Sequence, residues 1–169
     1  MERYVKILLY TYPLLKTVEK DYEECISNKA LLSYGNGKSA EETAMEIAYE
    51  IVCQRKFSWL KETLKGVIDR LSEVERARVE VRYFGKKRTR LLEVCKEKST
   101  GTLWSERKYF RRQAKAAEKV SAMFYGAGLT QERYLTEFVD MDIFRKIHRF
   151  VEEGKDKKIS AEERRRMRG

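Results

Sequence analysis

The stretch that decides the fold is residues 35–71, GNGKSAEETAMEIAYEIVCQRKFSWLKETLKGVIDRL. It opens with a Gly-Asn-Gly turn, which is typical of a helix end because glycine tolerates the left-handed backbone conformation. Ser39 then caps a new helix, and Glu42 three residues later completes a capping box. Apolar residues follow at helical spacing, which predicts one long amphipathic helix. These residues are Ala44, Ile47, Ala48, Ile51, Val52, Phe57, Leu60, Leu64, Val67, Ile68 and Leu71.

The segment before this turn predicts a partner helix from about Glu2 to Tyr34. Pro13, the chain's one proline, is expected to bend or restart that helix because proline lacks an amide donor and crowds the preceding turn. Two long helices joined by a glycine turn are expected to pack antiparallel, or to pair with a second copy of the chain. With 38% charged residues and so little proline, the composition predicts an all-α protein.

Further helices are predicted downstream. A second capping box, Ser72 with Glu75, opens a helix that ends near Gly85. A short helix over 89–98 and a turn at 99–101 precede a helix that Ser105 caps and that ends near Tyr125. Two more helices are expected after Thr130 and after Asp140, followed by a basic tail. The predicted organisation is a helical hairpin (1–70), a helix-turn-helix (71–125) and short C-terminal helices with the tail (126–169).

Positive charge is concentrated in residues 76–119, which hold 15 Lys and Arg against 5 Asp and Glu. The segments 1–75 and 120–154 each carry a net charge of −2, and the tail over 155–169 carries +4, out of a total of +10. A localised cationic surface attracts and holds a phosphate backbone. The charge distribution therefore predicts a nucleic-acid contact within residues 76–119.

Residues 88–120 follow the order of a helix-turn-helix: a support helix, a tight turn and a recognition helix with a polar first half. Basic side chains there can read guanine edges or grip phosphates, and the sequence leaves both uses open. A solvated helix face is the alternative, but such a face usually mixes charges at i, i+4 spacing. The expected apolar stripe of the recognition helix is Tyr109, Phe110, Ala114, Ala117 and Val120. The candidate DNA-binding residues are Arg88, Arg90, Ser105, Arg107, Lys108, Arg111, Arg112 and Lys115.

A family resemblance is carried by two stretches. Residues 71–85, LSEVERARVEVRYFG, resemble the first helix of region 4 of bacterial sigma factors, and residues 105–120, SERKYFRRQAKAAEKV, resemble its recognition helix. The run WSERKYF at 104–110 is also similar to phage-type transcriptional regulators of the ArpU and RinA kind. The resemblance implies sequence-directed DNA binding by the helix at 105–120 and a role in transcription on a prophage or other mobile element. No counterpart of sigma region 2 is recognisable, so a complete sigma factor is not expected.

The cysteines and the single histidine predict no metal centre. Cys25, Cys53 and Cys95 are widely spaced, so we expect reduced, partly buried thiols in a cytosolic protein. His148 has no clustered ligand partners in the sequence and is expected to be structural or solvent-facing.

No catalytic or cofactor motif is recognisable. Glu42, Glu46 and Glu50 recur at i, i+4 spacing, which could serve acid–base chemistry but favours an exposed helix face. Dinucleotide, P-loop, nucleophile-elbow and zinc-protease patterns are missing from the sequence. The apolar stretch near residues 5–15 is too short to span a bilayer and lacks the features of a signal peptide. We therefore expect no enzyme activity, no cofactor, no metal and no membrane partner.

The sequence thus predicts a cytoplasmic, sequence-specific regulator of transcription that binds double-stranded DNA. The hairpin is expected to contact RNA polymerase or to form a homodimer. The alternative is a helical phage assembly or interaction protein that binds nucleic acid nonspecifically, or an acidic partner, through its basic face. An RNA-binding protein is a third option. The basic tail either adds phosphate contacts or serves as a solubilising end.

Overall fold

The computed structural model describes residues 2–32, 37–86, 89, 91, 93 and 106–153. Regular structure within these ranges is helical, with no β-strand among them. The prediction of an all-α protein is therefore confirmed. The chain divides into two compact units, of which unit 1 comprises Met1–Tyr12 and Lys65–Gly169, and unit 2 comprises Pro13–Leu64.

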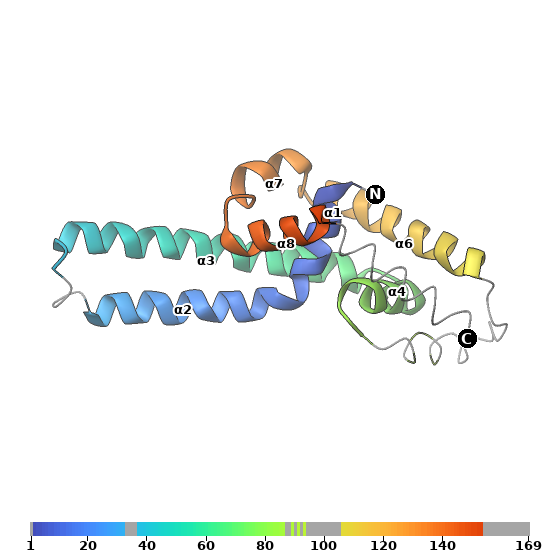
Figure 1. Cartoon of the computed structure of the whole chain (residues 1–169), viewed down its shortest axis with the longest axis horizontal. Coiled ribbons are helices and arrows are strands. Elements are labelled where there is room, and N and C mark those ends of the chain that lie inside the picture. The colour runs from blue at the N-terminus through green and yellow to red at the C-terminus, as the bar shows by residue number, and fades with distance from the viewer. Residues whose placement is uncertain are drawn as a thin grey trace. The chain divides into compact units, whose positions relative to one another are not determined.

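Unit 2 is an antiparallel helical hairpin (Figure 1). A 3-10 turn, Tyr12–Leu14, contains Pro13 and leads into α2 (Leu15–Leu32). The second long helix, α3 (Ala40–Asp69), contributes its residues up to Leu64 to the hairpin. Both the restart at Pro13 and the long helix after Ser39 are as predicted from the sequence.

The start of α3 is fixed by the expected capping box. The Glu42 amide donates to Ser39 Oγ at 3.1 Å, and the Ser39 amide donates to the Glu42 carboxylate at 2.9 Å. These two bonds satisfy amide groups that have no partner within the helix. Away from the turn, the rings of Tyr22 and Phe57 pack 5.2 Å apart. The buried side chains of the hairpin are Leu15, Thr43, Cys53, Phe57, Leu60 and Leu64.

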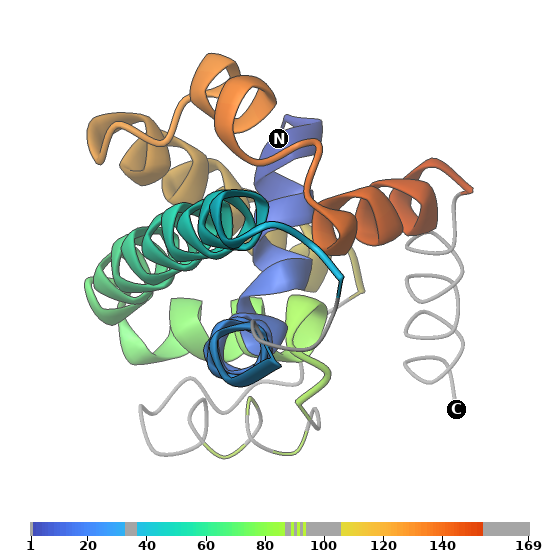
Figure 2. The same cartoon turned by 90° about the vertical axis from the view of Figure 1, so that its left-hand side faces the viewer.

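Unit 1 is built around α1 (Arg3–Thr11), which contacts both α4 (Glu73–Tyr83) and α8 (Asp142–Glu152). Figure 2 shows α1 running between these two helices. The other elements that the structure describes in this unit are α6 (Glu106–Gly126), α7 (Gln131–Glu137) and the last residues of α3. The helix predicted after Thr130 is found as α7, and the Thr130 side chain caps it by accepting a hydrogen bond from the Arg133 amide.

Aromatic contacts join the helices of unit 1. The ring of Tyr10 meets Tyr83 of α4 at 5.1 Å and Phe150 of α8 at 5.5 Å, both edge to face. Phe144 of α8 packs on Tyr134 of α7 at 5.8 Å, also edge to face. Such geometry is favoured by the ring quadrupole and adds to the area that each ring buries.

The predicted domain boundaries do not coincide with these units. Residues 1–12 were expected within the hairpin but belong with α4 and α8 in unit 1. The reason is the composition of α1, where Val5, Ile7, Leu8 and Leu9 are all fully buried. Apolar residues on several sides of one short helix need neighbours on several sides, which a two-helix hairpin does not supply.

Candidate nucleic-acid interface

One face of α6 anchors it in unit 1. Ala117, Val120 and Phe124 recur at helical spacing and are 5%, 0% and 0% exposed. The helix ends at Gly126, and Gly128 then adopts a φ of 75°, a left-handed conformation that favours glycine. The amide of Leu129 donates to the Phe124 carbonyl at 2.9 Å, which closes the helix end. The predicted helix over 105–125 is thus found over almost the same range.

An ion pair joins α6 to α4. Lys119 Nζ lies 2.8 Å from Glu75 Oε2, and the same carboxylate accepts hydrogen bonds from Ser72 at the start of α4. Burial acts to raise the pKa of Glu75, but the bonds from Lys119 and Ser72 outweigh it and hold the pKa below its usual value. Glu75 therefore stays ionised, and Lys119, although exposed, is engaged in the pairing of α6 with α4.

Apolar side chains from three segments meet beside this ion pair. Ala77 and Val81 of α4 form a buried cluster with Leu91, and Phe110 of α6 packs against it. Of the helix expected over 89–98, the structure describes Thr89, Leu91 and Glu93, and all three are helical. A helix-turn-helix needs such a shared core between its support and recognition elements.

The surface of α6 away from this core carries positive charge. Arg111 and Lys115 are exposed and lie one helical turn apart, so they project from the same side. We call this pair the basic face of α6. Neither residue has a hydrogen bond or ion pair to the rest of the described chain. Their side chains are therefore available to a phosphate or a base edge.

The other candidate residues have different outcomes. Arg112 is half-buried and takes part in an interaction within the chain. Ala114, expected in the apolar stripe, is exposed, and the neighbouring Ala116 is buried instead. Arg107 and Lys108 belong to α6, but their side chains lie outside the described residues. Arg88, Arg90 and Ser105, together with the basic tail over 155–169, also lie outside the described residues, and their roles remain predictions.

The charge count over 76–119 overstates the local excess of positive charge. Arg76 pairs with Asp69 at 3.2 Å, just as Lys119 pairs with Glu75, and both acidic partners precede the counted segment. Arg78 is only 6% exposed. Sequence reasoning could not find these pairs, because each joins residues that lie far apart on the chain or on neighbouring elements.

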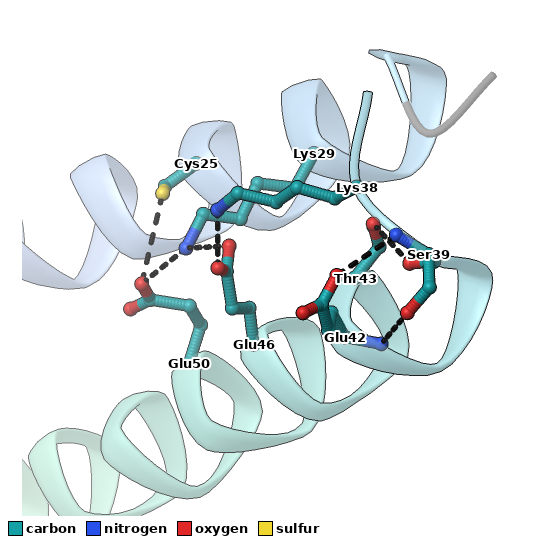
Figure 3. Close-up of polar contacts among 8 residues, drawn as sticks. All are labelled: Cys25, Lys29, Lys38, Ser39, Glu42, Thr43, Glu46 and Glu50. Atoms are coloured by element: carbon teal, nitrogen blue, oxygen red, sulfur yellow. Dashed lines mark hydrogen bonds and ion pairs between the residues drawn. The ribbon is translucent and has the colours of Figure 1, made fainter. Parts of the chain in front are cut away.

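Of the three carboxylates of α3 predicted to form an exposed face, Glu42 is exposed, but Glu46 and Glu50 are half-buried. Figure 3 shows Glu46 and Glu50 directed at α2 and at the turn. Lys29 Nζ lies 2.8 Å from Glu50 and 3.7 Å from Glu46, and Lys38 also pairs with Glu46. The bond to Glu50 raises the pKa of Lys29, which keeps the lysine ammonium charged. These contacts fasten the turn end of the hairpin.

The described thiols and the histidine match their structural interpretation. Cys25 and Cys53 are free cysteines, the first half-buried and the second buried, while Cys95 lies outside the described residues. His148 is half-buried, and its Nδ1 lies 3.3 Å from Glu152 one turn later. Within the described residues, no three His, Cys, Asp or Glu side chains are grouped as metal ligands. None of the described helices combines the length and apolar character needed to cross a membrane.

Comparison of the chain with protein-family models, with curated proteins and with solved structures gave no match.

Proposed function

We propose that this protein binds double-stranded DNA through the basic face of α6 and regulates transcription. The observation that carries the proposal is the arrangement of α6, which is buried on one side by Ala117 and Val120 while Arg111 and Lys115 are exposed. An α-helix held in this way can enter the major groove with its basic side chains against the bases and the backbone. The role in transcription is inferred from the resemblance to sigma region 4.

The packing beneath α6 supports the proposal. Base readout needs a recognition helix whose position is fixed, because a displaced side chain cannot make bidentate hydrogen bonds. The ion pair between Lys119 and Glu75 and the contact of Phe110 with the α4 cluster supply two independent points of attachment. They lie at different turns of α6, so they fix both the axis and the rotation of the helix.

Arg111 and Lys115 are expected to act differently. The planar guanidinium of Arg111 can donate two parallel hydrogen bonds to a guanine edge, whereas the ammonium of Lys115 suits a phosphate. Loss of a bidentate base contact lowers affinity for one site by about 1–3 kcal/mol, whereas loss of a phosphate contact weakens binding to all sequences alike. The two variants can therefore be told apart.

The test begins with selection of bound fragments from random DNA by the full chain. Affinities for the selected site and for random DNA are then measured for Arg111→Ala, Lys115→Ala and the control Arg149→Ala, which removes an exposed arginine of α8. We expect Arg111→Ala to lose more affinity for the selected site than for random DNA, and Arg149→Ala to bind like the wild type. If about six phosphates are contacted, the log–log dependence on salt should have a slope near −5.

Two outcomes would overturn the proposal. Equal losses on every DNA, with no enriched site, would instead support a nonspecific nucleic-acid-binding assembly protein. Unchanged binding in both α6 variants would remove the basic face from the contact altogether.

A further inference from the structure

The hairpin exposes an apolar surface on the side of α3 that faces away from α2. Met45, Tyr49 and Val52 are 69%, 66% and 49% exposed, which is high for large apolar side chains. Ala44 and Ala48 are exposed between them. Glu41 and Arg55 are exposed at the two ends of the same stripe. We call this set the outer face of α3: Glu41, Ala44, Met45, Ala48, Tyr49, Val52 and Arg55.

The corresponding side of α2 is an internal comparison. Its exposed residues are mostly polar and carry both signs of charge, as a solvated helix face should. Lys20 and Glu24, for example, form an exposed i, i+4 ion pair at 3.2 Å. The exposed residues of α2 are Lys16, Thr17, Lys20, Asp21, Glu23, Glu24, Ser27, Asn28, Ala30 and Leu31. The exposed surface of α2 is thus mostly polar, whereas α3 exposes an apolar stripe between residues 44 and 52.

The spacing of the outer face matches a helix–helix seam. Glu41, Met45, Ala48, Val52 and Arg55 are separated by alternating steps of four and three residues, the heptad spacing of helices that pack along their length. The seam is apolar in the middle, acidic at its N-terminal end and basic at its C-terminal end. A helix with the opposite order of charges would complement it.

We propose that the outer face of α3 binds the outer face of a second copy of this chain, with the two α3 helices antiparallel. A two-fold axis between Ala48 and Tyr49 puts Val52 of one copy level with Met45 of the other. Glu41 of each copy then lies level with Lys56 of the other copy and one residue from its Arg55. The two-fold symmetry repeats this contact at both ends of the seam. A parallel pair would instead set Glu41 against Glu41 and Arg55 against Arg55, which is unfavourable.

The length of the seam sets the expected strength of the contact. Residues 41–55 span about 22 Å of helix, and two such helices bury less area than a standard protein–protein interface. The dimer is therefore reversible and depends on protein concentration. It does not rest on the proposed function, because no residue of α6 takes part.

Sedimentation velocity of the full chain tests the proposal, without DNA and with a reductant present because Cys25 and Cys53 are free thiols. We expect a monomer–dimer equilibrium from low to several hundred micromolar protein. Val52→Glu puts a carboxylate into the seam twice per dimer, and it should raise the dissociation constant by about tenfold or more. The matched control is Leu31→Glu on α2, which changes a leucine that is 78% exposed and should leave the equilibrium unchanged.

Charge reversal tests the antiparallel orientation. Glu41→Lys and Arg55→Glu should each weaken the dimer, because each sets like charges together at both ends. The double variant restores opposite charges between positions 41 and 55 of the two copies, while Lys56 and Glu42 are unchanged, so it should associate more strongly than either single variant. Arg111→Ala should dimerise like the wild type, because α6 takes no part in the seam. A failure of the proposed DNA binding can therefore be distinguished from a failure of the proposed dimer.

Three results would overturn the proposal. They are a chain that stays monomeric at every concentration, equal effects of Val52→Glu and Leu31→Glu, or a double charge variant weaker than both single variants. If the chain stays monomeric, the outer face of α3 would be a binding surface for a different protein instead.

Discussion

The hairpin and unit 1 differ in what lies between their helices. Polar contacts run along the hairpin, where Glu19 pairs with Lys61 and Ser58, and Glu50 pairs with Lys29. In unit 1 aromatic rings join several of the helices, as Phe144 does with Tyr134, beside the α4–α6 ion pair of Lys119 with Glu75. Charged pairs depend on pH and salt, whereas apolar packing depends on neither to a comparable degree. The two units should therefore respond differently to the same changes in solution.

The largest expected effect is the loss of a core ring in unit 1. Phe124→Ala removes a side chain that is fully buried on α6, and such a change costs about 3–5 kcal/mol of unfolding free energy. Hydrogen exchange should show reduced protection of amides in α6. The matched variant Phe57→Ala removes a ring that is 1% exposed in the hairpin and should reduce protection in α2 and α3 instead. Identical exchange patterns for the two variants would contradict a division into two units.

A smaller loss is expected when a hairpin ion pair is broken. Glu19→Gln removes the carboxylate that pairs with Lys61, and their side chains are 16% and 29% exposed. Because the pair is partly shielded from water, we expect a loss of about 1–2 kcal/mol in denaturant unfolding. The control is Lys20→Gln, which breaks the pair with Glu24, whose side chains are 72% and 61% exposed. Lys20→Gln should change the unfolding free energy by no more than about 0.5 kcal/mol. An equal loss in both variants would contradict the idea that shielding from water strengthens the Glu19–Lys61 pair.

Acid should weaken the hairpin through the same carboxylate. The hydrogen bond from Lys61, helped by that from Ser58, holds the pKa of Glu19 below its usual value. Its contribution to stability is therefore complete above the unfolded pKa of about 4.3 and is lost as pH falls through the lower folded pKa. Thermal melts between neutral and acid pH should show a smaller acid loss for Glu19→Gln than for the wild type. Parallel curves would contradict this assignment.

Much of the fold is predictable from the ends of its helices. Ser39 with Glu42, and Ser72 with Glu75, form the capping boxes that their spacing indicates, and the helix restarts after Pro13. Capping is local, so the residues that decide it are adjacent in the sequence. On α6, the exposure of Arg111 and the burial of Val120 follow from helical periodicity in the same way.

Contacts between distant elements are not predictable in this way. Apolar residues lie on two sides of α3, and periodicity alone does not say that Phe57 faces α2 while Met45 faces away. The pairing of Lys119 with Glu75 likewise depends on how α6 crosses α4. A sequence gives the spacing of side chains on one helix, but not the partner that each face meets.

The smallest expected effect has the opposite sign and lies in unit 1. The hydroxyl of Tyr134 is buried and has no hydrogen-bond partner among the described residues, and burial raises the pKa of Tyr134 to about 12. Tyr134→Phe removes a polar group from an apolar site and keeps the ring contacts with Tyr4 and Phe144. Stability at neutral pH should therefore be unchanged or should rise by about 1 kcal/mol.

Alkaline titration sharpens this last test. An unfolded tyrosine ionises near pH 10, so the contribution of the protonated Tyr134 is complete below about pH 10 and is lost as pH rises toward 12. Urea unfolding across this range should show a steeper loss for the wild type than for Tyr134→Phe. Tyr125→Phe is the control, because that side chain is 72% exposed and its removal should leave the slope unchanged. A destabilised Tyr134→Phe at neutral pH would mean that the hydroxyl is hydrogen-bonded in solution. Unit 1 would then depend on a buried polar contact, as the hairpin does. The two units would differ only in how many such contacts each contains.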